Sequence, residues 1–370
     1  MSFWKKLAFS LIPMLILFGG LELVIRVLDL ANPEFIVAPL PTELRGFTEA
    51  DPDFFWRLKP GSMTNEPNGT IVRVNKTGFR GGELQPKTTN EYRILSLGES
   101  TTFGAGVNLE ETYSYLLAKN LNELDTLRDY NVLNCGFSAY SSFQMLEYLK
   151  LKGLSFKPDM VIVYSELNDY LPSTLRNFGY DETTLTLSDE ELKNSSVRNW
   201  ATRIVDHWAL AKFLSYKYAS FNARRLSSES LPNPLDDIGL EQNIPTRVAL
   251  RNDEKPVPAG LNDKNLGTRV KPKERKANFK EFQKICQENS FRLVVIHPAY
   301  LNSDKHECLL TGLCREENIP MFDSYNSLHS QEIPSSELFL DSWHPSPLGH
   351  ERLANDLAVF IHENRLTEVY

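Results

Sequence analysis

Five short apolar runs, separated by stretches of helical spacing, constrain the fold of this chain more than any other feature. The runs lie at residues 92–97, 130–134, 160–164, 293–297 and 319–322. Helical patterns occur at residues 112–124, 141–154, 278–288 and 347–363, and the last of them opens with a proline. Strands that are apolar along their whole length are buried on both faces, and strands that alternate with helices form parallel sheets. The sequence therefore predicts an α/β fold with a parallel sheet covered by helices on both faces.

The N-terminus has a different character. Lys5 and Lys6 precede an apolar run over residues 7–28, which contains Glu22 and Arg26 one helical turn apart. About 20 apolar residues suffice to cross a bilayer. Residues 1–30 are therefore predicted to form an uncleaved transmembrane anchor, with the N-terminus in the cytoplasm and the rest outside, in the periplasm if the cell is Gram-negative. A cleaved signal peptide is the alternative, although no small-x-small cleavage site stands at a suitable position.

Two further regions depart from the α/β pattern. Residues 31–91 are rich in Pro, Gly, Asn and Thr, and they predict a small β-rich lead-in lobe. The main domain then covers residues 92–370, with an insert at about 170–277 that lacks strong strands. Because the insert leaves the sheet at the carboxyl end of a strand, where ligands bind in open α/β sheets, it is interpreted as a lid or a substrate-binding segment.

The composition excludes some classes of function. The formal net charge is −8, so the chain offers no basic stripe for phosphates, and a general nucleic-acid binder is excluded. The four cysteines lack the paired C-x-x-C spacing of a zinc site. Cys135 and Cys286 are interpreted as small core residues. Cys308 and Cys314 are close enough in sequence to form a bridge in an oxidising compartment, and this question stays open.

The first chemical signal is the turn Gly98-Glu99-Ser100 at the end of the first predicted strand. A serine at the carboxyl end of a strand, beside a glycine, is exposed where a substrate arrives. A phosphate-binding loop would need a lysine directly after its second glycine, and Gly104 is followed by Ala105, so that interpretation is excluded. A serine that only caps the turn is the remaining structural alternative.

Three more signals complement this serine. Asp341 lies three residues before His344, and an aspartate in that position can orient the imidazole and stabilise its protonated form. Asn168 and Gly136 follow the third and second strands, where a side-chain amide and a backbone N–H can bind a developing oxyanion. The structural alternatives are a helix-capping aspartate, a structural histidine and ordinary turn residues.

In order and in strand context these signals resemble the SGNH/GDSL hydrolase family. The matches to the family's four blocks are Gly98-Glu99-Ser100 for Gly-Asp-Ser, Gly136 for the second block, Asn168-Asp169 for Gly-x-Asn-Asp with Glu166 in place of its glycine, and Asp341-x-x-His344 for the last block. The resemblance runs from about residue 93 to residue 357 and is interrupted by the insert. Upstream, residues 75–81 look like the lead-in of membrane-anchored bacterial members.

The resemblance implies a flavodoxin-like, three-layer α/β/α fold and a serine esterase that cleaves an O-acyl ester. Ser100 would be the nucleophile, with His344 as its base and Asp341 as the partner of His344. Ser100, Gly136 and Asn168 would form the oxyanion hole, and no metal or cofactor is implied. Family members outside the membrane often act on acylated carbohydrates or lipids, so such a substrate is expected. The alternatives are an O-acyltransferase that acts on an extracellular polysaccharide with the same triad, and a non-catalytic binding or assembly module.

Overall fold

The computed structural model describes residues 3–28, 47–51, 53–66, 68–171, 187–194, 208–211, 213–214, 268–301, 309–329 and 332–368. Most of the predicted insert lies outside these residues. Cys308 also lies outside them, so the Cys308–Cys314 bridge stays a prediction. Cys135 and Cys286 are buried free thiols, in agreement with their interpretation as core residues.

A five-stranded parallel sheet forms the centre of the molecule. Its strands are β5 (Glu91–Gly98), β6 (Asp129–Gly136), β7 (Met160–Tyr164), β8 (Arg292–His297) and β9 (Met321–Asp323). They are arranged in the order β6-β5-β7-β8-β9, and every neighbouring pair is parallel. This is the flavodoxin-like strand order, so the predicted parallel α/β class is confirmed. The order reverses between β5 and β7, and the carboxyl ends of these strands flank the crevice in which such sheets bind ligands.

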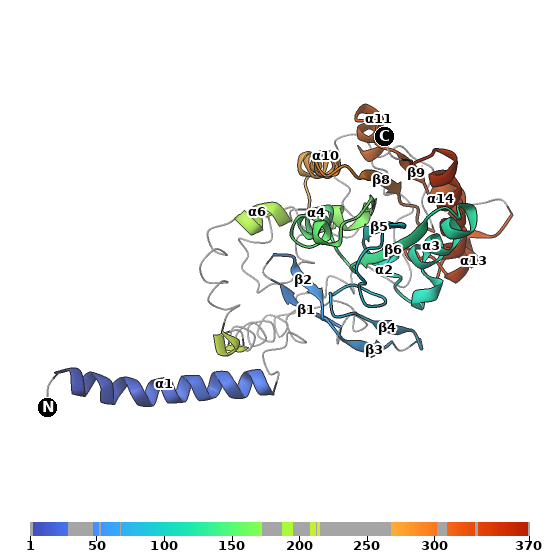
Figure 1. Ribbon diagram of the computed structural model, residues 1–370. Coiled ribbons are helices and arrows are strands. Elements are labelled where there is room, and N and C mark those ends of the chain that lie inside the picture. The colour runs from blue at the N-terminus through green and yellow to red at the C-terminus, as the bar shows by residue number, and fades with distance from the viewer. Residues whose placement is uncertain are drawn as a thin grey trace, which may run out of the picture.

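Helices cover both faces of this sheet (Figure 1). They are α3 (Tyr113–Leu124) and α14 (Pro347–Glu363) on one face, and α4 (Ser142–Leu151), α10 (Pro272–Glu288) and α11 (Leu309–Glu316) on the other. Successive strand residues point to opposite faces. Ile94 and Ile162 therefore belong to the core beneath α3 and α14, whereas Leu95 and Val161 belong to the core beneath α4 and α10.

The helices agree with the sequence patterns except at one boundary. The pattern at 278–288 corresponds to α10, but this helix begins six residues earlier, at Pro272. Proline is favoured in the first turn of a helix because the missing N–H has no helical partner there. The polar, Lys-rich residues that follow Pro272 belong to the helix and not to the insert's loop.

The lead-in region consists of two antiparallel hairpins. They are β1 (Thr48–Asp51) with β2 (Phe55–Leu58), and β3 (Met63–Asn65) with β4 (Ile71–Arg73). Phe47, Trp56 and Val72 are almost fully buried and share one hydrophobic core with strand residues of the main sheet. The lead-in hairpins therefore pack directly on the main domain.

The remaining described elements are short or lie at the N-terminus. The short ones are α2 (Ser100–Phe103), α5 (Leu167–Tyr170), α6 (Asp189–Asn194), α12 (Tyr325–Leu328), α13 (Ser335–Leu338) and the 3₁₀ helices Leu109–Glu111 and Gly153–Phe156. α1 (Phe3–Val27) covers the predicted anchor, and Arg26 pairs with Glu22 at 2.6 Å, as their spacing predicts. Within the residues that the structure describes, no helix combines the length and the apolar character needed to cross a membrane.

Candidate active site

Ser100 lies in a tight turn between β5 and α2. β5 ends at Gly98, and Ser100 is the first residue of α2. A Cβ on Gly98 would lie 1.9 Å from Thr102 Oγ1, so only glycine lets the helix fold back against the strand here. The Ser100 carbonyl accepts hydrogen bonds from the N–H groups of Gly104 (2.8 Å) and Ala105 (3.0 Å). The turn therefore holds Ser100 at the carboxyl edge of the sheet, between β6 and β7.

His344 and Asp341 reach Ser100 from the segment that precedes α14. His344 Nε2 lies 2.9 Å from Ser100 Oγ, and His344 Nδ1 lies 2.7 Å from Asp341 Oδ2. The backbone N–H groups of Trp343 (2.7 Å) and His344 (2.8 Å) donate to Asp341 Oδ1. The structure thus brings together the three residues predicted as a triad, from positions 244 residues apart.

The electrostatics of Asp341 favour its ionised form. Burial by itself raises the pKa of Asp341, but the hydrogen bonds from His344 and from the backbone outweigh burial and hold the pKa below its usual value. An ionised carboxylate at Nδ1 fixes the tautomer of His344, so that Nε2 can accept the Ser100 proton. The arrangement is that of a nucleophile, a base and a group that orients the base.

Asn168, the predicted amide donor, lies on α5 beside Glu99. Its Nδ2 donates to Glu99 Oε2 at 2.8 Å, and Tyr300 Oη donates to Glu99 Oε1 at 3.3 Å. Glu99 is only 2% exposed, and burial raises its pKa to about 8. An amide group has two N–H donors, so one bond to Glu99 orients the Asn168 amide and leaves the second hydrogen for a ligand.

Gly136, the predicted backbone donor, is engaged within the protein. It lies opposite Gly98 in the parallel register of β5 and β6. Its N–H donates to Asn134 Oδ1 at 3.1 Å, so it would have to exchange this bond to bind an oxyanion. A Cβ on Gly136 would lie 2.1 Å from the backbone nitrogen of Phe103. The glycine is therefore required for the close approach of α2 to β6.

Two acidic residues of the site depart from the family pattern, and both are buried next to Asn168. Glu99 contacts Asn168 directly, and Glu166 lies two residues before it with 3% exposure. Glu166 Oε2 is 3.9 Å from His297 Nε2, and His297 Nδ1 is 3.6 Å from Asp323 Oδ1. Sequence reasoning did not predict this buried polar cluster, although the two departures from the family pattern marked its location.

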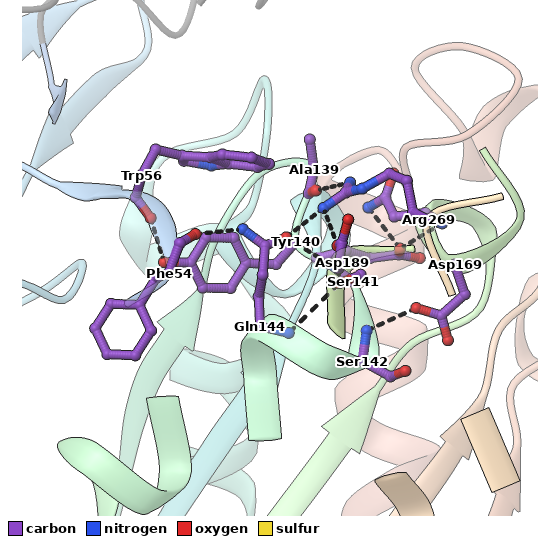
Figure 2. A network of polar contacts seen from close by, with 12 residues as sticks. Phe54, Trp56, Ala139, Tyr140, Ser141, Ser142, Gln144, Asp169, Asp189 and Arg269 are labelled. Atoms are coloured by element: carbon purple, nitrogen blue, oxygen red, sulfur yellow. Dashed lines mark hydrogen bonds and ion pairs between the residues drawn. The ribbon is translucent and has the colours of Figure 1, made fainter. Parts of the chain in front are cut away.

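Two residues of the insert, Asp189 and Arg269, form a buried ion pair beside the segment that follows β6 (Figure 2). Arg269 Nη2 lies 3.0 Å from Asp189 Oδ2, and both side chains are 0% exposed. Arg269 also donates to the carbonyl of Ala139 and to the side chain of Gln144, while Ser141 Oγ donates to Asp189 at 2.7 Å. Ala139, Ser141 and Gln144 belong to the loop and helix that follow Gly136. The root of the insert is therefore tied to the segment that leaves the active-site edge of β6.

Asp169, the last residue of the family's third block, lies behind the reactive groups. Its Oδ2 is 3.1 Å from Arg275 Nε, and its Oδ1 accepts the N–H of Ser142 at 2.6 Å. These contacts connect α5 to α10 and α4, so Asp169 stabilises the frame on which Asn168 is mounted. In the described part of the chain, no group of three or more His, Cys, Asp or Glu side chains is arranged to hold a metal ion.

No protein-family model and no curated protein matches the chain, but solved structures do. One is a two-domain esterase described as active on acetylated mannans, with 14% identity, a TM-score of 0.43, and a match that covers 75% of this chain and 50% of that one. A second, from Desulfitobacterium hafniense DCB-2, is assigned to the G-D-S-L lipolytic family, with 11% identity, a TM-score of 0.39, and coverage of 73% and 99%. A third is the acetylxylan esterase Axe2 from Geobacillus stearothermophilus, with 13% identity, a TM-score of 0.40, and coverage of 73% and 94%.

This chain spans about half the length of the two-domain esterase. These three structures are described as two esterases and a lipolytic protein.

Proposed function

We propose that the chain is a serine esterase that cleaves O-acyl esters through Ser100, His344 and Asp341. The observation that carries the proposal is the pair of distances at His344, 2.9 Å from Nε2 to Ser100 Oγ and 2.7 Å from Nδ1 to Asp341 Oδ2. Both lie within the hydrogen-bond range that proton transfer requires. A serine that merely capped a turn would not need a histidine–carboxylate pair aligned on its hydroxyl.

The geometry supports a two-step acyl transfer. Ser100 Oγ attacks the ester carbonyl carbon while His344 Nε2 takes the hydroxyl proton, and Asp341 stabilises the imidazolium that forms. The oxyanion accepts hydrogen bonds from the Ser100 N–H and from the free amide hydrogen of Asn168. The Gly136 N–H joins them if it exchanges its bond to Asn134. The C–O bond to the alcohol then breaks, His344 returns the proton to the leaving oxygen, and the acyl group stays on Ser100.

A second attack resolves the acyl-enzyme. Water gives a proton to His344 and attacks the acyl carbonyl carbon; the bond from that carbon to Ser100 Oγ breaks, His344 returns the proton to Ser100, and the acid leaves. A sugar hydroxyl can attack in the same way, and the sugar then leaves as the new ester. The first course makes the protein a hydrolase and the second an O-acyltransferase, and both use the same residues. Acetylated oligosaccharides are the first natural-type substrates to test, since two of the similar structures are described as esterases of acetylated mannan and of acetylated xylan.

The experiment uses the full chain, an aryl acetate and a serine-directed phosphonate. The wild type should release the aryl alcohol and take up one equivalent of phosphonate on Ser100, while Ser100→Ala should lose both reactions. Ser155→Ala is the matched control, because Ser155 is an exposed serine at the amino end of β7, far from the triad. Mass analysis with and without an oligosaccharide acceptor separates release of acetate from its transfer. A folded wild type that neither turns over the ester nor takes the label would favour the non-catalytic alternative.

The membrane anchor and the location outside the cytoplasm remain proposals from the sequence. The support from α1 is its set of exposed apolar side chains, among them Phe9, Ile16 and Leu23. Exposed apolar surface of this extent usually marks a contact with a membrane or a partner. A reporter fused after Tyr370 should be active only outside the cytoplasm. Cytoplasmic activity of the fusion, or recovery of the whole chain in the soluble fraction, would contradict the proposal.

A further inference from the structure

The segment 75–81, which the proposed chemistry does not use, forms a rigid loop in the lead-in region. Asn75 Oδ1 accepts the N–H groups of Thr77 (3.0 Å), Gly78 (2.9 Å) and Phe79 (3.2 Å). Gly78 has a φ of +93°, a conformation that glycine adopts without strain. The Asn75 Nδ2 donates to the carbonyl of Gly82 at 2.7 Å and closes the loop. The bonds from Asn75 to Phe79 and to Gly82 therefore fix the backbone on both sides of Arg80.

The backbone of Arg80 attaches this loop to the main sheet. Arg80 forms antiparallel bridges with Val74 on one side and with Asn134 on the other. Asn134 lies on β6, two residues before its end at Gly136. The lead-in loop therefore pairs with β6, the outermost strand of the sheet. It does so near the carboxyl end of β6, the end of the sheet at which Ser100 lies.

The side chain of Arg80 reaches the nucleophile's helix. It is 1% exposed, and its Nη1 donates to the carbonyls of Phe103 and Gly104, each at 2.7 Å. Its Nη2 donates to the carbonyl of Val107 at 2.7 Å, and its guanidinium carbon lies 4.9 Å from the centre of the Phe103 ring. One buried cation thus holds the carbonyl of Phe103, the last residue of α2, and those of Gly104 and Val107 in the loop that follows.

The bond to the Phe103 carbonyl supplies a partner at the end of α2, and the bonds to Gly104 and Val107 fix the loop that leaves it. A helix of four residues has no stable hydrogen-bond ladder of its own, because formation of the first turn is unfavourable. Its terminal carbonyls also lack helical partners. Gly104, held by Arg80 through its carbonyl, donates its N–H to the Ser100 carbonyl at 2.8 Å. Arg80 therefore holds the backbone of Gly104, and Gly104 in turn holds the backbone of Ser100.

The loop 103–107 also contacts the segment that carries His344, the proposed base. A Cβ on Gly106 would lie 2.8 Å from Leu340 Cδ1, so the backbone of this loop packs against the residue before Asp341. The Leu340 N–H donates to the His344 carbonyl at 2.8 Å. The loop 103–107 therefore bonds to the Ser100 carbonyl at one end and packs against Leu340, the neighbour of Asp341, at the other.

We propose that Arg80 is a positioning residue, which fixes the loop 103–107 so that Ser100 Oγ stays within hydrogen-bond distance of His344 Nε2. The inference rests on the proposed esterase function and adds a residue outside the triad. A lysine cannot replace the arginine here, because three carbonyls in different directions need the planar fork of the guanidinium and not one ammonium group. Burial of a cation is costly, which is consistent with a role in the site rather than in general stability.

The test compares Arg80→Lys and Arg80→Ala with Arg73→Lys and Arg73→Ala in the full chain. Arg73 is the matched control, because it lies on β4 of the same lead-in region but is exposed. The readouts are the second-order rate of Ser100 labelling by a phosphonate, and kcat and KM for an aryl acetate. Both Arg80 variants should lower kcat and the labelling rate by about 100-fold, the loss expected for a misplaced reacting group, with KM little changed. Both Arg73 variants should behave like the wild type.

Chemical rescue separates positioning from a merely structural role. Guanidinium ion at millimolar concentration should restore labelling in Arg80→Ala and should have no effect on Ser100→Ala or Arg73→Ala. If folded Arg80→Lys and Arg80→Ala label at the wild-type rate while only their melting temperatures fall, the residue is structural and the inference is wrong. If Arg80→Ala does not fold, Arg80→Lys decides alone, and labelling at the wild-type rate overturns the proposal. If the folded wild type takes up no label, the proposed esterase function is contradicted, and the inference about Arg80 fails because it depends on that function.

Discussion

Two polar networks meet at Ser100, and they keep their carboxyl groups in opposite states. The first, Asp341 with His344, is open to solvent, with side-chain exposures of 52% and 25%. The second, Glu99 with Asn168, is buried, with exposures of 2% and 5%. Although partial burial of Asp341 acts to raise its pKa, hydrogen bonds hold that pKa below its usual value, whereas burial raises the pKa of Glu99 to about 8. At neutral pH Asp341 is therefore ionised, and Glu99 mostly keeps its proton.

The difference shows how environment gives different roles to two carboxyl groups near the same nucleophile, Glu99 as its neighbour in the sequence and Asp341 through His344. The ionised one can stabilise a positive charge as it develops on His344. The neutral one can orient the Asn168 amide without placing a second negative charge beside an oxyanion. Pairs of carboxyl groups with separated pKa values are typical of sites that use one for charge stabilisation and the other for a different purpose. Each network can be broken independently.

The largest effect is expected from the exposed network. Asp341→Asn should lower kcat/KM for an aryl ester by about 10⁴-fold, because an amide neither stabilises the imidazolium nor fixes the required tautomer of His344. The matched control is Glu337→Gln, which neutralises an exposed acidic residue in the same segment. Steady-state kinetics near neutral pH give the ratio. A loss below tenfold for Asp341→Asn in a folded protein would mean that His344 does not depend on this carboxylate.

A smaller effect is expected from the amide of the buried network. Asn168→Ala should lower kcat by about 10² to 10³-fold with little change in KM, since an oxyanion donor acts mainly in the transition state. The control is Asn131→Ala, because Asn131 lies on β6 and its amide donates to Glu91 Oε1 at 2.8 Å, away from the triad. If Asn168→Ala raised KM and left kcat unchanged, the amide would bind the ground state of the substrate and would not belong to the oxyanion hole.

The sequence predicted the exposed network much better than the buried one. Ser100, Asp341 and His344 carry their chemistry in the residue type and lie beside recognisable strand or helix boundaries, so a local pattern suffices to find them. The five strands were also found within a few residues, because strands buried on both faces are apolar along their whole length. Their order, β6-β5-β7-β8-β9, followed only from the resemblance and not from the pattern itself.

The buried contacts could not be predicted because they depend on tertiary packing. Tyr300 approaches Glu99 across 201 residues, and nothing in its own neighbourhood suggests a polar partner. Arg80 lies in a recognisable motif, but its four carbonyl acceptors are backbone groups that any sequence would supply. Gly136 was selected for its N–H, yet its structural constraint is the approach of Phe103, which a strand pattern does not reveal.

The smallest effect concerns stability and tests the protonation of Glu99. In the unfolded chain this group titrates near its ordinary value of 4.5, and in the folded chain near 8. Between these pH values the folded state holds a proton that the unfolded state has released, so the free energy of unfolding falls as the pH rises. One proton contributes a slope of at most about 1.4 kcal/mol per pH unit. Burial is the main cause of the raised pKa of Glu99, and the nearby Asp169 and Glu166 carboxyl groups add to the rise, whereas the hydrogen bond from the Asn168 N–H and the charge of Arg275 oppose it.

Glu99→Gln should remove this contribution, because glutamine does not ionise and its carbonyl still accepts from Asn168. Urea unfolding of the wild type and the variant at pH 5, 6, 7 and 8 measures the two slopes, with Glu316→Gln, an exposed glutamate on α11, as the control. The variant should gain stability relative to the wild type as the pH rises toward 8, while the control follows the wild type. Parallel curves for Glu99→Gln and the wild type would mean that Glu99 is already ionised at pH 5. Two ionised carboxyl groups would then flank Ser100, and the division between the exposed and the buried network would not exist.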